Sequence, residues 1–161
     1  PKPSSAASDV YKRQLSEADE NGWIDNHGHI YFLKSGMIIH ISEISGFKHI
    51  WLTKHSGSMS WPITEGKWEV KSILHIDEIN EIVYFMANKS SIFEDKLYSI
   101  NFDGNDLKCL TKEPGNHKVK VLGSKKYFFD TYSNFDQPKI ITLKTYIKFY
   151  LDLGLVKTTT K

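Results

Sequence analysis

The segment IWLTKHSGSMSWPIT, residues 50–64, is repeated in outline 47 residues later by LYSINFDGNDLKCLT, residues 97–111. Both segments begin with apolar residues, carry a glycine at their eighth position and end in an aliphatic residue followed by threonine. A second set of matches is offset by 49 residues and pairs Gly66, Trp68 and Val70 with Gly115, His117 and Val119. The chain therefore contains two copies of one unit, with a two-residue insertion between them.

The length of this unit indicates its architecture. Repeats of about 40–50 residues that are built from short strands are typical of β-propeller blades, each of which is a four-stranded sheet. A blade cannot bury both faces of its sheet by itself. The repeat therefore predicts that this chain is part of a larger ring of blades.

Turn residues separate apolar stretches of strand length along the chain, which predicts consecutive antiparallel meanders. The expected strands are residues 29–34, 37–43, 48–54, 60–64, 68–76, 81–87, 96–102, 107–111, 117–122, 126–132 and 139–143. The predicted fold class is all-β, a partial β-propeller of about two and a half four-stranded antiparallel blades. We expect blade breaks near Gly66 and Gly115, antiparallel pairing of residues 81–87 with 96–102, and an edge position for Pro62, which lacks an N–H.

The chain divides into three parts. Residues 1–14, PKPSSAASDVYKRQ, are small and polar, and we interpret them as a disordered or non-native extension. Residues 15–144 form the partial propeller. The tail, residues 145–161, remains unassigned, because its apolar residues fit either a strand or a short helix. The chain begins without Met, and we expect it to be an interior piece of a longer protein.

Composition excludes several classes of partner. The chain has 21 basic and 19 acidic residues with the two signs interspersed, so we expect no binding to nucleic acid. No apolar run is long enough to span a bilayer. The single cysteine, Cys109, cannot form an internal disulfide, and its place in a strand predicts a buried, inert thiol.

An ordered series of short motifs carries a family resemblance. The motifs are Asn21–Ile24, Ser42–Ile50, Thr64–Val70, Ile76–Glu78, Val83–Phe85, Lys96–Tyr98, Asp103–Gly104, Cys109–Thr111 and Asp130–Asn134. In this order and spacing they resemble the N-terminal β-propeller of the dipeptidyl peptidase IV group, within the prolyl oligopeptidase family of serine peptidases. The likeness covers about residues 21–143.

The resemblance implies a parent protein in which the propeller precedes an α/β-hydrolase domain that carries the Ser, Asp and His. The propeller would gate the access of peptide substrates to that domain. The expected partners are therefore the C-terminal α/β-hydrolase domain, peptide substrates and a second copy of the parent in a homodimer. The resemblance also implies a periplasmic, secreted or membrane-anchored parent. A stand-alone propeller that serves as a protein-interaction scaffold is the alternative function.

The chain lacks the nucleophile of such a peptidase. An α/β-hydrolase serine lies on a strand-to-helix elbow with the pattern G-x-S-x-G, and no such pentapeptide occurs here. The nearest sequence, Gly57–Ser60, lacks the closing glycine and lies in a predicted turn. We therefore expect no catalytic residue in this chain and no activity of the chain alone.

By resemblance, the segment after Gly22-Trp23 edges the pocket that receives substrate. We predict that Trp23, Ile24, Asp25, Asn26 and His27 are the substrate-proximal residues, with Trp23 packed beneath the other four. An ordinary solvated loop is the alternative. The short polar groups suit hydrogen bonding to a peptide backbone, and binding residues commonly lie on loops above a rigid sheet.

Other side chains are interpreted structurally. Asp25, His27 and His29 alternate and would share one face of a strand, but a polar start to the strand explains them, and we expect no metal and no cofactor. Trp68 is expected to fill the space between neighbouring blades. Glu43 and His49, on either side of a turn, are expected to form a hydrogen-bonded pair.

Overall fold

The computed structural model describes residues 29–123 and 127–145, and within these ranges the chain forms eleven strands and no helix. The first blade contains β1 (Ile30–Phe32), β2 (Met37–Ser42), β3 (His49–Lys54) and β4 (Ser60–Pro62). The second contains β5 (Val70–Asp77), β6 (Ile82–Ser91), β7 (Glu94–Asn101) and β8 (Lys108–Cys109). The third contains β9 (Asn116–Val121), β10 (Tyr127–Asn134) and β11 (Gln137–Thr145). The described ranges therefore hold no helix that could cross a membrane.

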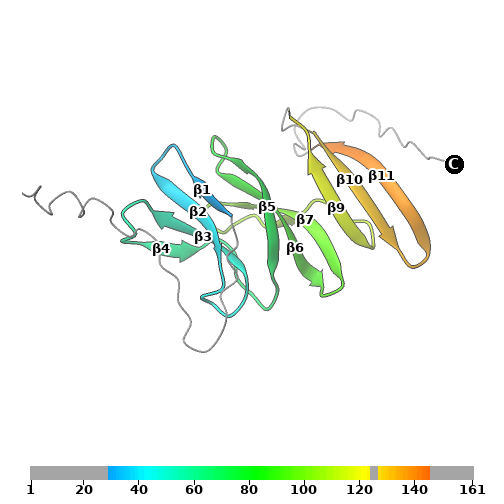
Figure 1. Ribbon diagram of the computed structural model, residues 1–161, viewed down its shortest axis with the longest axis horizontal. Coiled ribbons are helices and arrows are strands. Elements are labelled where there is room, and N and C mark those ends of the chain that lie inside the picture. Colours follow the sequence, from blue (N-terminus) through cyan, green and yellow to red (C-terminus); the bar gives the residue numbers. More distant parts are fainter. Residues whose placement is uncertain (1–28, 124–126, 146–161) are drawn as a thin grey trace, which may run out of the picture.

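Each blade is an antiparallel meander in which sequential strands are neighbours. The strand orders are β1-β2-β3-β4, β5-β6-β7-β8 and β11-β10-β9, and the three sheets lie side by side (Figure 1). The predicted all-β partial propeller is confirmed. Gly66 lies between β4 and β5, and Gly115 between β8 and β9, as predicted for the blade breaks. Val83 of β6 is opposite Ile100 of β7, and Pro62 lies in the edge strand β4.

The meanders place their turns at two opposite edges of the molecule. We call the edge at which β1, β5 and β9 begin the start edge, and it also carries the turns at residues 43–48, 92–93 and 135–136. These turns lie along the lower side of Figure 1. The opposite edge, with the turns at residues 33–36, 55–59, 78–81 and 102–107, is called the far edge.

The sequence repeat is realised as one hydrogen bond that occurs twice. The N–H of Ile50 donates to the hydroxyl oxygen of Thr64 at 2.9 Å, and the N–H of Leu97 donates to that of Thr111, also at 2.9 Å. Both threonines are buried. Each hydroxyl follows a fourth strand of only two or three residues and ties the chain back to the third strand. The 47-residue offset in the sequence thus corresponds to one hydrogen bond that closes each blade, that is, ties the end of its fourth strand to its third strand.

His49 supports the first closure, and the predicted Glu43–His49 pair is wrong. The Nε2 atom of His49 lies 2.9 Å from the carbonyl oxygen of Gly66, which can only accept, so Nε2 carries the proton in the neutral ring. Nδ1 then accepts from the Thr64 hydroxyl at 3.0 Å. Both ring nitrogens are therefore used, and Glu43 forms an ion pair with Lys48 at 3.5 Å instead.

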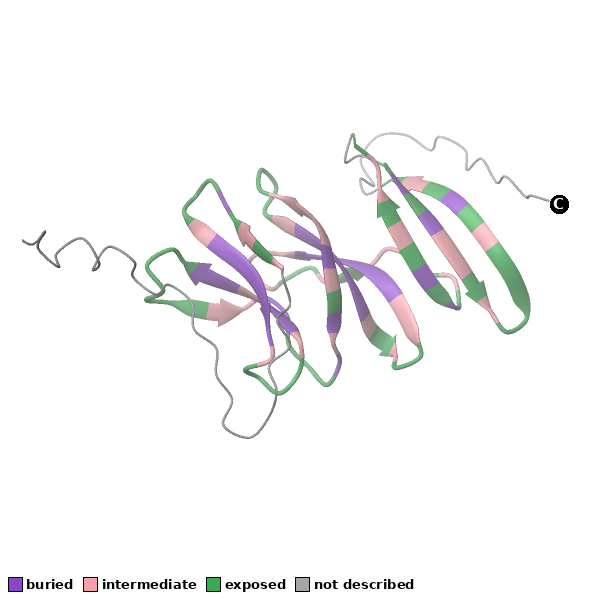
Figure 2. Ribbon diagram, in the orientation of Figure 1, coloured by how far each residue is buried: buried purple, intermediate pink, exposed green. Residues whose placement is uncertain are grey.

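Trp68 fills the space between the first two blades, as predicted. Its ring packs edge to face against the ring of His49 in the first blade, with 4.9 Å between the ring centroids. It also stacks on the ring of Phe85 in the second blade, at a centroid distance of 6.3 Å. A side chain at Gly66 would lie 2.4 Å from the Trp68 indole nitrogen, so the tight crossing between these blades requires glycine. Figure 2 shows that burial is concentrated in β2, β3, β6 and β7.

The third blade has one face packed and one face open. Phe128 is buried against Tyr84, Met86 and Leu97 of the second blade. Residues on the other face of the same strands are exposed, namely Tyr127, Phe129, Ile141 and Leu143. Phe129 is directly opposite Leu143, so these side chains form a continuous apolar strip. Such a strip is the kind of surface that another blade or another molecule covers.

We predict that the isolated chain associates with itself. The strip on the third blade and the exposed Ile30 and Phe32 on edge strand β1 leave apolar surface at both ends of the row of blades. Size-exclusion chromatography should give a concentration-dependent apparent mass, and an apolar dye should bind. A sharp monomer peak at all concentrations, without dye binding, would contradict this prediction.

A second prediction concerns the blade closure. Thr111→Val keeps the shape of the side chain but removes the acceptor for the buried Leu97 N–H. The substitution should lower the free energy of unfolding by about 1–3 kcal/mol, the cost of an unsatisfied buried donor. Thr131→Val, in the third blade, is the control and should change the free energy of unfolding by less than about 0.5 kcal/mol. Equal effects in urea titrations would show that the Thr111 hydroxyl does not hold the blade closed.

Candidate functional site

The residues predicted to lie near substrate, Trp23–His27, fall outside the described part of the chain. His29 is the first described residue and directly precedes β1, so the chain enters the first blade at the start edge. Of the three residues considered as zinc ligands, Asp25 and His27 also lie outside the described ranges, and His29 lies within them. Among the residues that are described, no three His, Cys, Asp or Glu side chains are grouped as metal ligands would be.

The start edge carries the exposed apolar turn residues of all three blades. Ile44 and Phe47 belong to the β2–β3 turn, Ile92 and Phe93 to the β6–β7 turn, and Phe135 to the β10–β11 turn. Phe93 is 81% exposed, and Phe135 is fully exposed. Within the described residues, the far-edge turns expose two large apolar residues, Met59 and Ile79. An apolar concentration of this kind on one edge marks an interaction surface.

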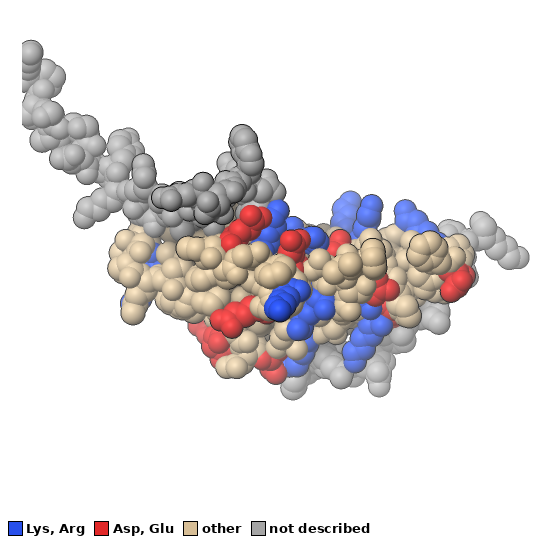
Figure 3. Space-filling view, turned by 90° about the horizontal axis from the view of Figure 1, so that it is seen from below, with Lys and Arg blue, Asp and Glu red and all other residues tan. Residues whose placement is uncertain are grey.

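Charges on this edge are mixed. In Figure 3, which views the molecule from the side of the start edge, acidic and basic side chains alternate and leave uncharged surface between them. Glu43 pairs with Lys48, Glu69 with Lys71 at 2.7 Å, and Glu94 with Lys96 at 3.1 Å. The visible surface therefore has no single-sign field and suits a partner with apolar and mixed polar groups.

A pocket of about 310 Å³ lies at the start edge between the second and third blades. Phe93, Phe135 and Gly115 are among the residues that line it. The N–H of Gly115 donates to a Glu94 carboxylate oxygen at 2.9 Å, which links the two blades. Hydrogen bonding to Lys96 is the main cause that holds the pKa of Glu94 below its usual value.

Gly115 is required at this junction. Its φ is +124°, and a side chain there would lie 2.4 Å from the carbonyl oxygen of Ser133. Asn134 completes the junction, because its side-chain amide donates to the carbonyl oxygen of Pro114 at 3.3 Å and its Oδ1 accepts from the N–H of Asp136 at 3.0 Å. The turn that presents Phe135 is thus held to the blade crossing.

A buried charge network lies within the third blade. Asp130 and His117 have fully buried side chains, and their Oδ1 and Nδ1 atoms are 2.8 Å apart. Lys144 Nζ lies 2.9 Å from Asp130 Oδ2 and 2.7 Å from Glu113 Oε2, and so bridges the two carboxylates. The contact with Asp130 Oδ2 is an ion pair without the geometry of a hydrogen bond. The Nε2 atom of His117 lies 2.9 Å from the carbonyl oxygen of Glu113. His117 thus has an oxygen atom within hydrogen-bond distance of each ring nitrogen.

The network sets the charge states of its members. Burial acts to raise the pKa of Asp130, but the contacts with His117 and Lys144 outweigh it and hold that pKa below its ordinary value of 3.8. Burial likewise acts to lower the pKa of Lys144, but Glu113 and Asp130 raise it above its ordinary value. The fully buried Asp130 carboxylate is thus compensated by its contacts with His117 and Lys144, and the more exposed Glu113 also pairs with Lys144.

This network is structural and does not have the arrangement of a catalytic site. A His that acts as general base must keep one nitrogen free for the proton that it abstracts. Both nitrogens of His117 are engaged, and its ring stacks on Tyr132 at 5.0 Å. The sequence reasoning did not identify the network, although a polar His117 at the repeat position of Trp68 was a visible signal for it. Cys109 is half-buried, and its thiol donates to the carbonyl oxygen of Thr111.

Comparison with known proteins gives consistent results. The family model described as "Dipeptidyl peptidase IV (DPP IV) N-terminal region" matches residues 4–139. A probable dipeptidyl peptidase 4 of Aspergillus fumigatus is 31% identical over 135 residues, which cover 78% of this chain and 18% of that protein. Dipeptidyl peptidase 4 of Trichophyton equinum is 28% identical over 130 residues, or 73% of this chain and 16% of that protein.

A solved structure gives the same similarity in three dimensions. The crystal structure of Porphyromonas gingivalis dipeptidyl peptidase 4 matches with a TM-score of 0.64 and 26% sequence identity. The match covers 73% of this chain and 16% of that chain. This chain therefore spans less than a fifth of the length of the proteins that it matches here.

The buried network generates a prediction. Asp130→Asn keeps the shape of the side chain but leaves the buried Lys144 with one carboxylate partner instead of two, and should lower the free energy of unfolding by about 3 kcal/mol at neutral pH. The exposed Asp106–Lys108 pair supplies the control, since Asp106→Asn should cost less than about 1 kcal/mol.

The pH dependence of the difference in unfolding free energy between wild type and Asp130→Asn tests whether the Asp130 charge causes it. Because the pKa of Asp130 is depressed in the folded state, its stabilisation is present above its unfolded pKa, near the ordinary value of 3.8, and is lost as pH falls through the lower folded value. The difference between wild type and Asp130→Asn should therefore shrink below about pH 4. A difference that is constant down to pH 2 would exclude the charge as its origin.

Proposed function

The chain belongs to the family of dipeptidyl peptidase IV N-terminal regions, and from this premise we propose that it is the propeller segment of a dipeptidyl-peptidase-like serine peptidase. In this proposal the blades gate the access of peptides and help to bind them, and an α/β-hydrolase domain of the parent chain performs the proteolysis. The observation that carries the proposal is the family match over residues 4–139, together with relatives named dipeptidyl peptidase 4.

We propose that the start edge faces the hydrolase domain. The apolar turn residues Ile92, Phe93 and Phe135 support this orientation, because such side chains are usually covered by a partner. Domain interfaces within a chain combine apolar contacts with mixed polar groups. The paired charges and uncharged surface of this edge have that character (Figure 3).

The same orientation gives the blades their gating role. Hydrogen bonds from Val70 N–H to the Lys48 carbonyl oxygen at 2.8 Å and from Gly115 N–H to Glu94 join successive blades at the start edge. Blades that are tied at this edge form a rigid wall beside the peptide. A rigid wall selects peptides by size, since a folded protein cannot pass where an extended chain can.

We further propose that Trp23, Ile24, Asp25, Asn26 and His27 lie nearest to substrate. The chain that carries them enters β1 at the start edge, the edge assigned here to the hydrolase domain. Asp25, Asn26 and His27 offer donors and acceptors that suit a peptide backbone. Trp23 would support them as an apolar anchor.

The parent gene distinguishes this function from a stand-alone scaffold. A segment downstream that encodes G-x-S-x-G, followed by Asp and then His, within roughly 250 residues would support the peptidase. Further blades followed by a stop codon would support the protein-interaction scaffold and overturn the proposal.

The 161-residue chain alone should not hydrolyse Gly-Pro or Ala-Pro chromogenic substrates. It lacks a nucleophile elbow, and with it the activated serine and oxyanion hole that the reaction requires. The assay uses purified chain with and without a serine-directed phosphonate. Turnover that the phosphonate abolishes would show that the chain holds a catalytic serine.

In the full-length enzyme, Asp25→Ala combined with His27→Ala should raise KM for peptides several-fold and leave kcat nearly unchanged, because binding contacts are lost without loss of the catalytic groups. Ser56→Ala with Ser58→Ala, in an exposed far-edge turn, is the matched control. Melting temperatures would verify that both variants fold. Unchanged kinetics for dipeptide and longer substrates would remove residues 23–27 from the binding site.

A further inference from the structure

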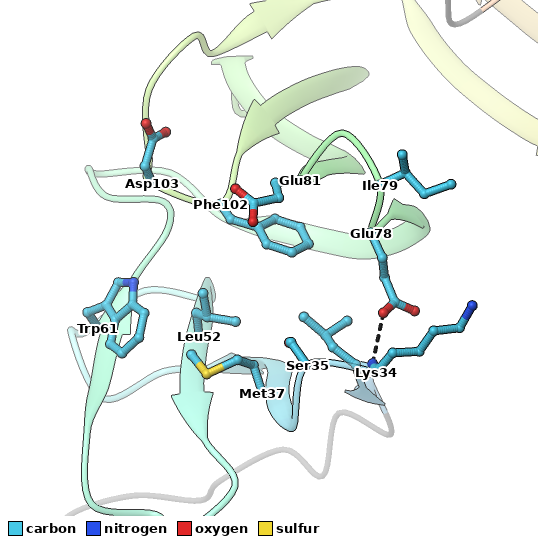
Figure 4. A pocket seen from close by; sticks show the side chains of 11 residues that line it. Lys34, Ser35, Met37, Leu52, Trp61, Glu78, Ile79, Glu81, Phe102 and Asp103 are labelled. Atoms are coloured by element: carbon cyan, nitrogen blue, oxygen red, sulfur yellow. Dashed lines mark hydrogen bonds between the residues drawn. The ribbon is translucent and has the colours of Figure 1, made fainter.

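A second cavity lies at the far edge, away from the surface assigned to the hydrolase domain. Its volume is about 580 Å³, and it opens where turns of the first blade meet turns of the second (Figure 4). Cavities that hold small ligands have volumes of about 300–1,000 Å³. The proposed peptidase function makes no use of this cavity.

The walls of the cavity are apolar. Leu33 and Leu52 are buried, and Met37 and Trp61 complete the side that the first blade contributes. Phe102 faces them from the second blade (Figure 4). Met37, Trp61 and Phe102 are only half-buried, so they retain apolar surface that a ligand could cover. The two aromatic rings also offer π faces, which attract cations.

The rim of the cavity is acidic. Glu78, Glu81 and Asp103 all come from turns of the second blade. Lys34 is the one basic residue in the lining, and Figure 4 shows its side chain extending away from the cavity. Its backbone N–H donates to Glu78 Oε2 at 2.8 Å, which closes one end of the cavity without neutralising the carboxylate.

Two of the three acidic groups keep their charge available. Hydrogen bonds from the N–H and side-chain amide of Asn105 hold the pKa of Asp103 below its usual range. The carboxylate of Glu81 makes no hydrogen bond or ion pair within the described residues. The rim therefore presents more negative charge than the local basic groups offset.

The acidic turn is fixed without any ligand. One Asp77 carboxylate oxygen accepts from the N–H groups of Ile79 and Asn80, both at 3.1 Å, and the other accepts from the Asn80 amide at 2.8 Å. The N–H of Phe102 donates to the carbonyl oxygen of Glu81 at 2.8 Å. The wall and the rim are thus held in place together, as in preformed ligand sites.

We propose that this cavity binds an amphiphilic organic cation, that is, an apolar chain or ring that ends in one ammonium or guanidinium group. The apolar part would lie against Leu52, Trp61 and Phe102, and the cation would lie between Glu78 and Glu81. An anionic ligand of the same shape is repelled by the rim, and a neutral one gains only the apolar contact. A free amine and a Lys or Arg side chain beside an apolar residue of a peptide share this chemistry.

Three probes of one shape test the proposal in the full 161-residue chain. They are 4-phenylbutylammonium, 4-phenylbutanol and 4-phenylbutyrate, followed by calorimetry and by backbone amide shifts in NMR spectra. The ammonium should bind about fivefold more tightly than the alcohol, and the carboxylate most weakly, as expected for a partly exposed pair of charges. The shifted amides should cluster at residues 33–37, 78–81 and 102–103.

Variants separate charge from apolar contact. Glu78→Gln with Glu81→Gln should abolish the preference for the ammonium and leave the affinity for the alcohol unchanged, because glutamine keeps an acceptor for the Lys34 N–H. The Glu81 side chain makes no hydrogen bond or ion pair within the described residues, so Glu81→Gln alone is the variant to use if the double variant does not fold. It should lower the affinity for the ammonium about twofold. The exposed Glu65→Gln is the control and should change nothing.

A peptide arm identifies the source of the cation. Acetyl-Phe-Lys-amide is compared with its acetyl-lysine analogue, and tighter binding of the charged peptide at the same amides would indicate a peptide ligand. Binding of 4-phenylbutylammonium alone would indicate a free amine, and either result supports the proposal. Equal affinities for the three probes, a preference that survives in the double variant, shifts confined to other residues or an absence of binding would each overturn it.

Discussion

The structure depends on the hydroxyl groups of Thr64 and Thr111, which close the first and second blades. Each accepts a backbone N–H of the third strand at 2.9 Å, beside a fourth strand that is too short to hold its neighbour by its own backbone hydrogen bonds. Within a few residues of each closure the chain turns through Gly66 or Gly115 and crosses to the next blade. Because the closure and the crossing are adjacent, the hydroxyl group determines where one blade ends and also how the next one begins.

The two crossings use different chemistry at one repeat position. Trp68 fills the first junction with an aromatic ring, and the equivalent His117 joins a buried network with Asp130 and Lys144. The Trp68 junction needs only a side chain that fills its volume. The His117 junction needs every member of its network, because one unpaired charge in the interior costs several kcal/mol. The second crossing is therefore the more sensitive of the two to substitution and to acid.

The sequence predicted the architecture well because the fold depends on short-range features. Turn residues and apolar runs located the strands and both blade breaks, and the 47-residue offset identified the repeat before its hydrogen bonds were known. The network around His117 was missed because Glu113, Asp130 and Lys144 are far apart in sequence and follow no motif. The Glu43–His49 pair was predicted from proximity along the chain, but His49 instead reaches across the blade to Thr64 and Gly66. Residues 23–27 were assigned by resemblance alone, and their role as a substrate-proximal segment stays a proposal.

The functional account rests on the orientation of the blades, with the start edge toward the hydrolase domain and the far edge away from it. Lysine cross-linking of the complete parent protein, read by mass spectrometry, measures this orientation directly. Lys67 and Lys89 lie at the start edge, and Lys34 and Lys54 at the far edge, and all four are exposed. The account predicts that Lys67 and Lys89 cross-link to residues beyond position 161 that carry the G-x-S-x-G sequence, and that Lys34 and Lys54 do not. Cross-links to that domain from Lys34 and Lys54, with none from Lys67 and Lys89, would contradict it.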